Sequence, residues 1–506
     1  MPQYLLAHDL GTSGNKATLY TTEGKLVGSQ IYSYDTHVSH ANWVEQNPDD
    51  WWKAVCVTTK NLVSSIDVKE IAAVSFSGQM MGCLCVDDRG NPLRESLIWA
   101  DMRSTKEMEQ IRAGISDQDF YRITGHRISP SYGGQKLMWV KNNEPDLYRK
   151  TYKMLNAKDY ILLKLTGEFV TEYTDASSTC LMDLGRRVWS DQLIDVMGLD
   201  KEKLPQLLAS TDIAGTVTRQ AAQECGLLEG TPVVCGGGDG VCAAVGTGCV
   251  KEGIAHSCMG TSSWISITTK EPVYDEEMRT FTWAHIVPGY VLPTGTMQCG
   301  GGSMSWLKNT LCQYEGVLAE QQQVSPYDIL EQETNRSPIG AKGLLFLPYL
   351  IGERSPRWNP HARGAFVGLT MEHTKDDIVR AVQEGVALNL GVVMDCFKKK
   401  GVRIDEMTLI GGGAKSQAWR QIFADMYRCD IQKPNVLEEA TSMGAAITGG
   451  VGVGAFDNFD VIDKFLTIES VQHPIEENAK VYDSLKPIFD QCYEGLTGVY
   501  EKLAAF

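Results

Sequence analysis

Residues 4–16 have the sequence YLLAHDLGTSGNK, and this stretch decides the fold. An apolar run ends in a glycine-rich turn and a second apolar run follows, which is typical of two strands joined by a tight turn. A third strand is expected before residue 34, because residues 23–25, EGK, are a hairpin signal. The carboxyl group of Asp9 and the hydroxyl groups of Thr12 and Ser13 therefore lie close to the first turn.

Strand and helix signals alternate along the rest of the chain, and this order favours an α/β fold. Asn47 is a suitable N-cap for a helix over residues 48–65. A short β-rich run at residues 71–75 predicts the next strand, and another buried strand is expected over residues 231–235. An amphipathic helix is predicted for residues 476–503.

The pattern of the first strands recurs in the middle of the sequence. Residues 257–262, SCMGTS, repeat the strand, Gly-Thr-Ser, strand order of residues 8–13, HDLGTS. Each copy opens one half of the chain, so we predict two duplicated domains, over residues 1–247 and 248–506. Glycine-rich breaks in the pattern between residues 245 and 253 favour a boundary there.

Composition limits the classes of function. The 506 residues hold 47 Lys and Arg against 63 Asp and Glu, a formal charge of −16. Such an acidic chain repels nucleic-acid phosphates and anionic lipid, so neither is expected as a partner. No apolar run approaches the ~18 residues of a membrane span, and Asp9 interrupts the apolar stretch that a signal peptide needs. The fourteen cysteines are dispersed and form no C-x-x-C pair, which indicates reduced thiols in a cytoplasmic protein.

Three glycine-rich turns that follow strands are candidates for phosphate binding, at residues 9–16, 260–262 and 411–416. Glycine lets backbone N–H groups approach phosphate oxygens closely. The Walker A pattern is missing, which excludes a P-loop protein. Asp9 and Asp239 each end a predicted strand beside a glycine-rich turn, where a buried carboxylate is costly unless a cation is near. The pair therefore indicates Mg²⁺ held through water and one general base.

An ordered set of motifs over residues 4–455 resembles the FGGY carbohydrate kinases of the actin-like ATPase superfamily. The xylulokinase branch is the most similar, through residues 77–82 and the Gly-Gly-Gly-Asp run at 236–239. The resemblance implies two actin-like (ribonuclease H-like) domains with the active site in the cleft between them. The other motifs that carry it are Asp9–Lys16, Lys136 with Trp139, Asp159-Tyr160 with 165–167, 348–349 with 352–354, 364–369, 411–414 and 440–446.

The resemblance also implies roles for single residues. Asp239 is the base that takes the proton of the sugar hydroxyl, and it shares the Mg²⁺ with Asp9. The residues expected to face the sugar, besides Asp239, are Gln79, Met80, Met81 and Asp101. The residues expected to bind ATP are Thr12, Ser13, Lys16, Gly260, Thr261, Gly301, Ser305, Gly412, Gly413 and Gln417.

Some of these assignments leave alternatives open. Trp99, Asp101 and Arg103 either line the sugar site, with Asp101 accepting from hydroxyls and Trp99 stacking, or form a surface ion pair beside a core tryptophan. Xylulokinases typically have His where this chain has Met81, and Asn where it has Gly240. Both missing side chains would hydrogen-bond sugar hydroxyls, and sites that recognise hydroxyls discriminate strongly. The kinase prediction therefore does not specify the sugar.

The activity that we expect is ATP-dependent phosphorylation of a ketopentose such as xylulose on its terminal hydroxyl. A kinase for ribulose, gluconate or glycerol is the first alternative, because of the two departures from the xylulokinase pattern. A non-metabolic actin-like ATPase switch is the second, although the sequence has no extension for binding a client. Besides the sugar substrate, a second copy of the chain in a homodimer is the other partner that is compatible with the sequence.

Overall fold

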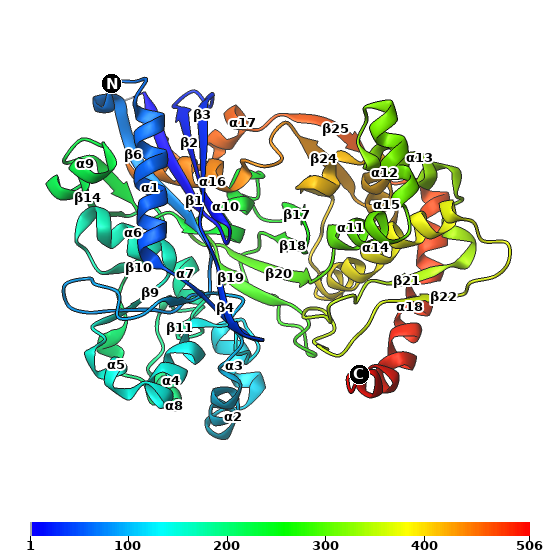
Figure 1. The fold of residues 1–506 in the computed structure, drawn as a ribbon, viewed down its shortest axis with the longest axis horizontal. Coiled ribbons are helices and arrows are strands. Elements are labelled where there is room, and N and C mark those ends of the chain that lie inside the picture. Colours follow the sequence, from blue (N-terminus) through cyan, green and yellow to red (C-terminus); the bar gives the residue numbers. More distant parts are fainter. Residues whose placement is uncertain (1–2) are drawn as a thin grey trace.

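Each half of the chain forms its own mixed sheet in the computed structural model, which describes residues 3–506 (Figure 1). In the N-terminal sheet, β1 lies between an antiparallel β2 and a parallel β6. The strands in spatial order are β14 (Ile213–Thr216), β15 (Pro232–Val234), β6 (Ile71–Gly78), β1 (Tyr4–Leu10), β2 (Gly14–Thr21) and β3 (Leu26–Ser33), and β16 (Gly237–Gly238) also pairs with β6.

The C-terminal sheet repeats this arrangement. β17 (Ala255–Met259) lies between an antiparallel β18 (Ser263–Ile267) and a parallel β23 (Glu406–Ile410). The two Gly-Thr-Ser turns therefore occupy equivalent places, each between the first two strands of its sheet, as the predicted duplication requires. The remaining strands of this sheet are β19 (Phe281–Ala284) and β20 (Val291–Met297) beyond β18, and β24 (Asp430–Pro434) and β25 (Ile468–Gln472) beyond β23.

Helices begin and end close to where the sequence signals place them. The Asn47 side chain accepts a hydrogen bond from the Asp49 N–H at 3.1 Å and caps α1 (Pro48–Val63). The last helix, α18, spans Glu476–Leu503 as predicted. Other helices that position the site are α4 (Gly133–Asn143), α6 (Ala157–Thr166), α7 (Tyr173–Ser177), α10 (Asp239–Gly246), α11 (Gly301–Thr310), α13 (Pro326–Arg336), α14 (Lys375–Lys399) and α15 (Gln417–Tyr427).

Shorter elements fill in around the two sheets. They include the strands β4 (His37–His40), β5 (Trp43–Gln46), β7 (Leu84–Val86), β8 (Ser96–Leu97), β9 (Lys153–Leu155), β10 (Val170–Glu172), β11 (Met182–Asp183), β12 (Val188–Trp189), β13 (Gln206–Leu208), β21 (Leu345–Leu347) and β22 (Ala365–Val367). The helices are α2 (Thr105–Gly114), α3 (Asp117–Thr124), α5 (Pro145–Lys150), α8 (Asp191–Met197), α9 (Arg219–Cys225), α12 (Gln313–Gln322) and α17 (Ile462–Phe465).

One helix of the second half, α16 (Ala440–Gly452), packs on the N-terminal sheet. Figure 1 shows it in orange among the blue strands of the first half. Its Met443 and Ala445 share a core with Leu5 of β1 and Ala73 of β6. We propose residues 1–247 and 248–506 as the two domains, with α16 as the helix that crosses back.

Two further expectations from the sequence concern the state of the cysteines and the presence of membrane-spanning helices. All fourteen cysteines are free thiols, and most are buried among apolar side chains. Between residues 3 and 506, the structure has no helix that is both long and apolar enough to cross a membrane.

The contact between α10 and α16 predicts a strong effect of a single methyl group. A Cβ added at Gly444 would lie 1.9 Å from the backbone oxygen of Cys242, closer than any real contact. Gly444→Ala should therefore lower the free energy of unfolding in urea by about 1–3 kcal/mol. Gly495→Ala on α18 is the matched control, since a Cβ there meets nothing within 4 Å. It should raise stability by up to about 1 kcal/mol, and equal gains for both variants would contradict the described contact.

Candidate active site

Two carboxylates lie near the ends of β1 and β16, the strands that pair with β6 from opposite sides. Asp9 stands next to the end of β1, and Ser77 opposite it in β6 donates its hydroxyl to Asp9 Oδ1 at 2.8 Å. β16 pairs with the same stretch of β6 and leads directly into α10, whose first residue is Asp239. Strand pairing therefore brings together two acidic side chains that are far apart in the sequence.

Burial changes how both carboxyl groups ionise. Desolvation, followed by the nearby negative charge of Asp9, raises the pKa of Asp239 to about 7. Desolvation also raises the pKa of Asp9, although the Ser77 hydroxyl and the charge of Lys16 oppose this effect. Titratable groups perturbed in this way are typical of functional sites.

A divalent cation would relieve the repulsion between these carboxylates. The donor set fits Mg²⁺, which is bound by one or two carboxylates, water and substrate phosphates. Within residues 3–506 there is no cluster of three or more His, Cys, Asp or Glu that could hold a metal ion on its own. The remaining ligands of a cation at Asp9 and Asp239 would therefore come from water and phosphate.

A cavity of about 210 Å³ opens beside Asp239. Thr12 and Met81 line it from the first half of the chain, and Ser262 and Thr294 from the second, so the cavity lies between the two halves. Much of its wall is aromatic. These side chains are Trp99, Tyr132, Trp264, Phe281, Trp283 and Trp358.

Some of the residues predicted to face the sugar do line this cavity. Met80, Met81 and Asp239 are on its wall, and so is Gly240, the second departure from the xylulokinase pattern. Met81 adopts a left-handed backbone conformation with φ of 64°, and its N–H donates to Ser178 Oγ at 3.0 Å. The two positions that depart from the xylulokinase pattern therefore meet at one cavity.

Gln79 and Asp101 are placed elsewhere. Gln79 is buried and donates from Nε2 to Gln46 Oε1 at 2.7 Å. Asp101 accepts from Arg103 Nη2 at 2.7 Å, from Arg103 Nε at 2.9 Å and from the Val44 N–H at 2.7 Å. The sequence left a sugar contact and a surface ion pair open for Asp101. The structure shows an ion pair with Arg103, but both side chains are buried and not on the surface, whereas Trp99 does line the cavity. Among the described residues, neither Gln79 nor Asp101 lines the cavity, because each side chain turns toward a buried polar partner.

Lys136 explains one motif that the sequence analysis left without a role. Its ammonium is fully buried and donates to the backbone oxygens of Met81 at 2.8 Å, Ile98 at 2.7 Å and Ser131 at 2.5 Å. These oxygens belong to three separate segments that carry residues of the cavity wall, including Trp99. Desolvation lowers the pKa of Lys136 to about 7. A single side chain from α4 thus ties three walls of the cavity together.

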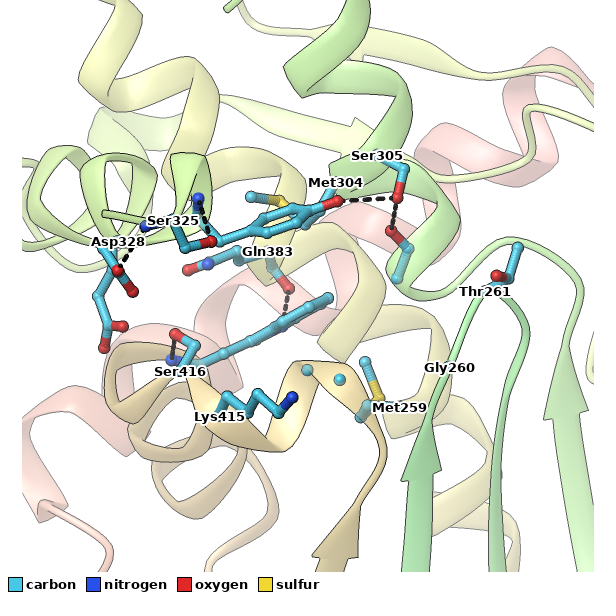
Figure 2. Close-up of a pocket in the computed structure, with 16 residues that line it drawn as sticks. Met259, Gly260, Thr261, Met304, Ser305, Ser325, Asp328, Gln383, Lys415 and Ser416 are labelled. Carbon is cyan, nitrogen blue, oxygen red and sulfur yellow. Dashed lines mark hydrogen bonds between the residues drawn. The ribbon is translucent and has the colours of Figure 1, made fainter. Parts of the chain in front are cut away.

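A second cavity, of about 430 Å³, lies within the C-terminal half (Figure 2). Figure 2 shows Gly260 and Thr261 on the turn after β17, Ser305 on α11, Ser325 and Asp328 at the start of α13, and Lys415 on the turn after β23. Its volume falls in the range of ordinary small-molecule sites.

Two positions in the wall of this second cavity require glycine, because neighbouring atoms leave no room for a Cβ. A Cβ on Gly301 would lie 2.5 Å from the backbone oxygen of Gly260, and one on Gly413 would lie 2.8 Å from Met259 Cβ. Six of the ten predicted ATP-binding residues line the cavity. They are Gly260, Thr261, Gly301, Ser305, Gly412 and Gly413.

The other four predicted ATP-binding residues lie outside this cavity wall. Thr12 lines the cavity beside Asp239 instead. Ser13 lies in the turn between β1 and β2, and Gln417 is the first residue of α15. Lys16 donates from Nζ to the backbone oxygen of Glu438 at 3.0 Å, so it bridges the two halves of the chain.

Sequence reasoning missed several residues of the second cavity. Tyr327 forms a hydrogen bond with Ser305 between their hydroxyl groups at 3.1 Å, and Trp419 and Gln383 also line the wall. The only sequence signal in this region is the capping box formed by Ser325 and Asp328. A capping box indicates where a helix begins, not which cavity the helix faces.

Comparison with known families matches both halves of the chain. The model for the N-terminal domain of the FGGY family of carbohydrate kinases matches residues 4–246. The model for the C-terminal domain of the same family matches residues 255–453.

Individual relatives cover the chain from end to end. A gluconokinase from Bacillus subtilis (strain 168) is 32% identical over 100% of this chain and 98% of its own length. A xylulose kinase from Staphylococcus xylosus is 30% identical over 97% of this chain and 100% of its own. The crystal structure of a ligand-bound xylulose kinase from Lactobacillus acidophilus is similar with a TM-score of 0.91, at 28% identity over 99% of each chain.

The raised pKa of Asp239 predicts a characteristic pH dependence. A carboxylate that accepts a proton must be ionised, so kcat/KM for the sugar should fall as the pH drops through about 7, where the pKa lies. Asp239→Asn should lower kcat by about 10²–10⁴-fold above pH 7, where the unmodified carboxylate is ionised, while ADP binding, measured by calorimetry, stays unchanged. An acid limb that is unchanged in Asp239→Asn would contradict the assignment of this titration to Asp239.

Proposed function

Because the chain belongs to the FGGY family of carbohydrate kinases, we propose that it transfers a phosphoryl group from ATP to the terminal hydroxyl of a ketopentose such as xylulose. The coarser activity follows from the family itself, since its members are phosphotransferases with an alcohol group as acceptor. The identity of the sugar is the part that the proposal adds.

The observation that carries the proposal is the position of Asp239. Its carboxylate stands on the wall of a cavity of about 210 Å³, which is sized for one small sugar. A pKa of about 7 suits a group that must accept a proton near neutral pH. Asp239 therefore takes the proton of the sugar hydroxyl as that oxygen attacks the terminal phosphorus of ATP.

The second cavity provides the nucleotide site in this proposal. Backbone N–H groups of the turns at Gly260 and Gly412 approach the phosphates, and the hydroxyl of Thr261 adds a donor. Asp9 and Asp239 would hold Mg²⁺ through water, and the ion would neutralise charge that develops on the phosphates. Thr12 and Lys16, both in the first half of the chain, remain candidates for contacts to the phosphates. In this proposal they face the nucleotide when the two halves close.

One observation favours gluconate as a second candidate substrate. Arg354 lines the sugar cavity, and its Nε donates to the neutral amide oxygen of Gln298 at 3.1 Å. Desolvation raises the pKa of the adjacent Glu353 to about 8, so that neighbour is largely protonated at neutral pH. A guanidinium without a close counter-charge is suited to a carboxylate ligand, and gluconate carries one.

A substrate panel separates these candidates. The panel contains D-xylulose, D-ribulose, D-gluconate and glycerol in an assay coupled to ADP release. The proposal expects the highest kcat/KM for D-xylulose, with a change of less than about threefold in Arg354→Met, because a neutral sugar needs no counter-charge. Arg363→Met in the same loop is the control, since Arg363 does not line the cavity. Highest activity on D-gluconate, lost about 10²-fold in Arg354→Met alone, would replace the ketopentose by the sugar acid.

The two departures from the xylulokinase pattern predict a tolerant cavity. Met81 and Gly240 offer no side-chain hydrogen bond to the sugar, so a substrate lacking a hydroxyl or carrying a methyl group should lose only about 1–3 kcal/mol. Met81→His combined with Gly240→Asn should raise kcat/KM for D-xylulose relative to its deoxy analogues. Strict specificity of the unmodified enzyme for xylulose, or a shift of that ratio in the opposite direction, would show that these positions do not control specificity.

A further inference from the structure

The segment that carries the catalytic base has no side chains of its own to anchor it. Gly236 to Gly238 form a triple-glycine run that ends at Asp239. The N–H of Gly236 donates to the backbone oxygen of Ser210 at 3.0 Å, and the N–H of Gly238 donates to Thr174 Oγ1 at 2.8 Å. Besides the pairing of β16 with β6, the placement of the base therefore depends on Ser210 and Thr174.

Both of these partners are held by one carboxylate, that of Glu172. Its Oε2 accepts from Ser210 Oγ at 2.7 Å, and its Oε1 accepts from Thr174 Oγ1 at 2.6 Å. The backbone N–H groups of Thr174 and Asp175 donate to the same carboxylate at 2.8 and 2.9 Å. Hydrogen bonds to an ionised group are short and strong, so four donors fix the orientation of Glu172.

A buried counter-charge stabilises this arrangement. Lys158 Nζ lies 3.6 Å from Glu172 Oε1, 3.2 Å from Asp175 Oδ2 and 2.8 Å from Asp159 Oδ1, and all four side chains are buried. Desolvation lowers the pKa of Lys158, but the three carboxylates outweigh it and raise the pKa well above its usual value. A buried ionic cluster is costly to assemble, and desolvation, with the neighbouring carboxylates, raises the pKa of Asp175 well above its usual value.

The cluster stands behind the base, not on a cavity wall. Lys158, Glu172 and Thr174 line neither the cavity beside Asp239 nor the cavity of the C-terminal half, so they do not contact substrate in either. The same cluster reaches the other glycine segment of the site, because a Cβ on Gly78 would lie 2.9 Å from Lys158 Cβ. Its position is thus that of a support for the residues that meet the sugar.

We propose that Glu172 is a positioning residue, which acts through Ser210 and Thr174 to fix the triple-glycine segment and thereby the direction of the Asp239 carboxylate. The proposal rests on the proposed role of Asp239 as the base. Glu172 exchanges no proton with the sugar. Its contribution is to keep the accepting oxygen of Asp239 within reach of the hydroxyl when the substrate is bound.

Thr174→Val is the main test, because valine has the shape of threonine but cannot accept from Gly238 or donate to Glu172. We expect kcat to fall about 10–100-fold, since a displacement of 1 Å at a reacting group can have an effect of this size. KM for ATP should change by less than about twofold, because the nucleotide cavity does not include this segment. Thr174→Ser restores the hydroxyl and should recover most of the loss.

Thr171→Val is the matched control. Thr171 is three residues away and equally buried, but its hydroxyl has no hydrogen-bond partner within the described chain. This variant should keep kcat and KM. If Thr174→Val does not fold, Ser210→Ala provides the same comparison, since it removes the bond to Glu172 but keeps the backbone oxygen that Gly236 uses.

The outcomes separate this proposal from the proposed function. A Thr174→Val enzyme that unfolds at lower temperature yet keeps its kcat would overturn the positioning role, because support for the fold alone would then explain the cluster. An equal loss of kcat in Thr174→Val and Thr174→Ser would also overturn the positioning role. If Asp239→Asn itself keeps its kcat, then the base assignment fails, and it fails independently of Glu172.

Discussion

The contact between α10 and α16 determines how the two halves of the molecule meet. A Cβ on Gly246 would lie 1.9 Å from the backbone oxygen of Ala440, and one on Gly444 would lie equally close to that of Cys242. Only glycine permits two helix backbones to approach so closely. Because α10 begins at Asp239 and α16 packs on β1 and β6, this approach joins the second half of the chain to the elements that carry Asp9 and Asp239.

Electrostatics then decides what the site can do. Asp9 and Asp239 are two acids withdrawn from water, and each makes ionisation of the other less favourable. The result is one carboxyl group with a pKa raised to about 7 and a pair of oxygen donors that would suit a divalent cation. The overall charge of −16 has little bearing on this chemistry, because fields of exposed charges are screened within about 8–10 Å by salt.

The sugar cavity combines rigid support with a weakly polar lining. Lys136 ties three backbone segments of its wall together, and the cluster around Glu172 holds the segment of the base. The lining itself is largely aromatic, and Met81 and Gly240, which bring no polar side chain, lie on the same wall. The buried groups that support this cavity and the side chains that line it are therefore different residues.

Local signals were sufficient for the elements and for the duplicated turns. The cap at Asn47, the period of the helix over residues 476–503 and the paired Gly-Thr-Ser turns depend only on neighbours in the sequence, and the structure agrees with them at those places. The positions of Asp9 and Asp239 near strand ends could be predicted from the sequence for the same reason.

Local sequence signals did not predict the direction in which a side chain points. Asp101 follows Trp99 closely in sequence, yet Arg103 and the Val44 N–H turn its carboxylate away from the cavity. Tyr327 and Trp419 line the nucleotide cavity only because α13 and α15 converge on it. The sequence by itself determined which strands, helices and glycine turns form, because these depend on local propensity and periodicity. Only the tertiary structure decided which polar side chains face substrate and which are bound by a buried partner, because that competition depends on groups far apart in the chain.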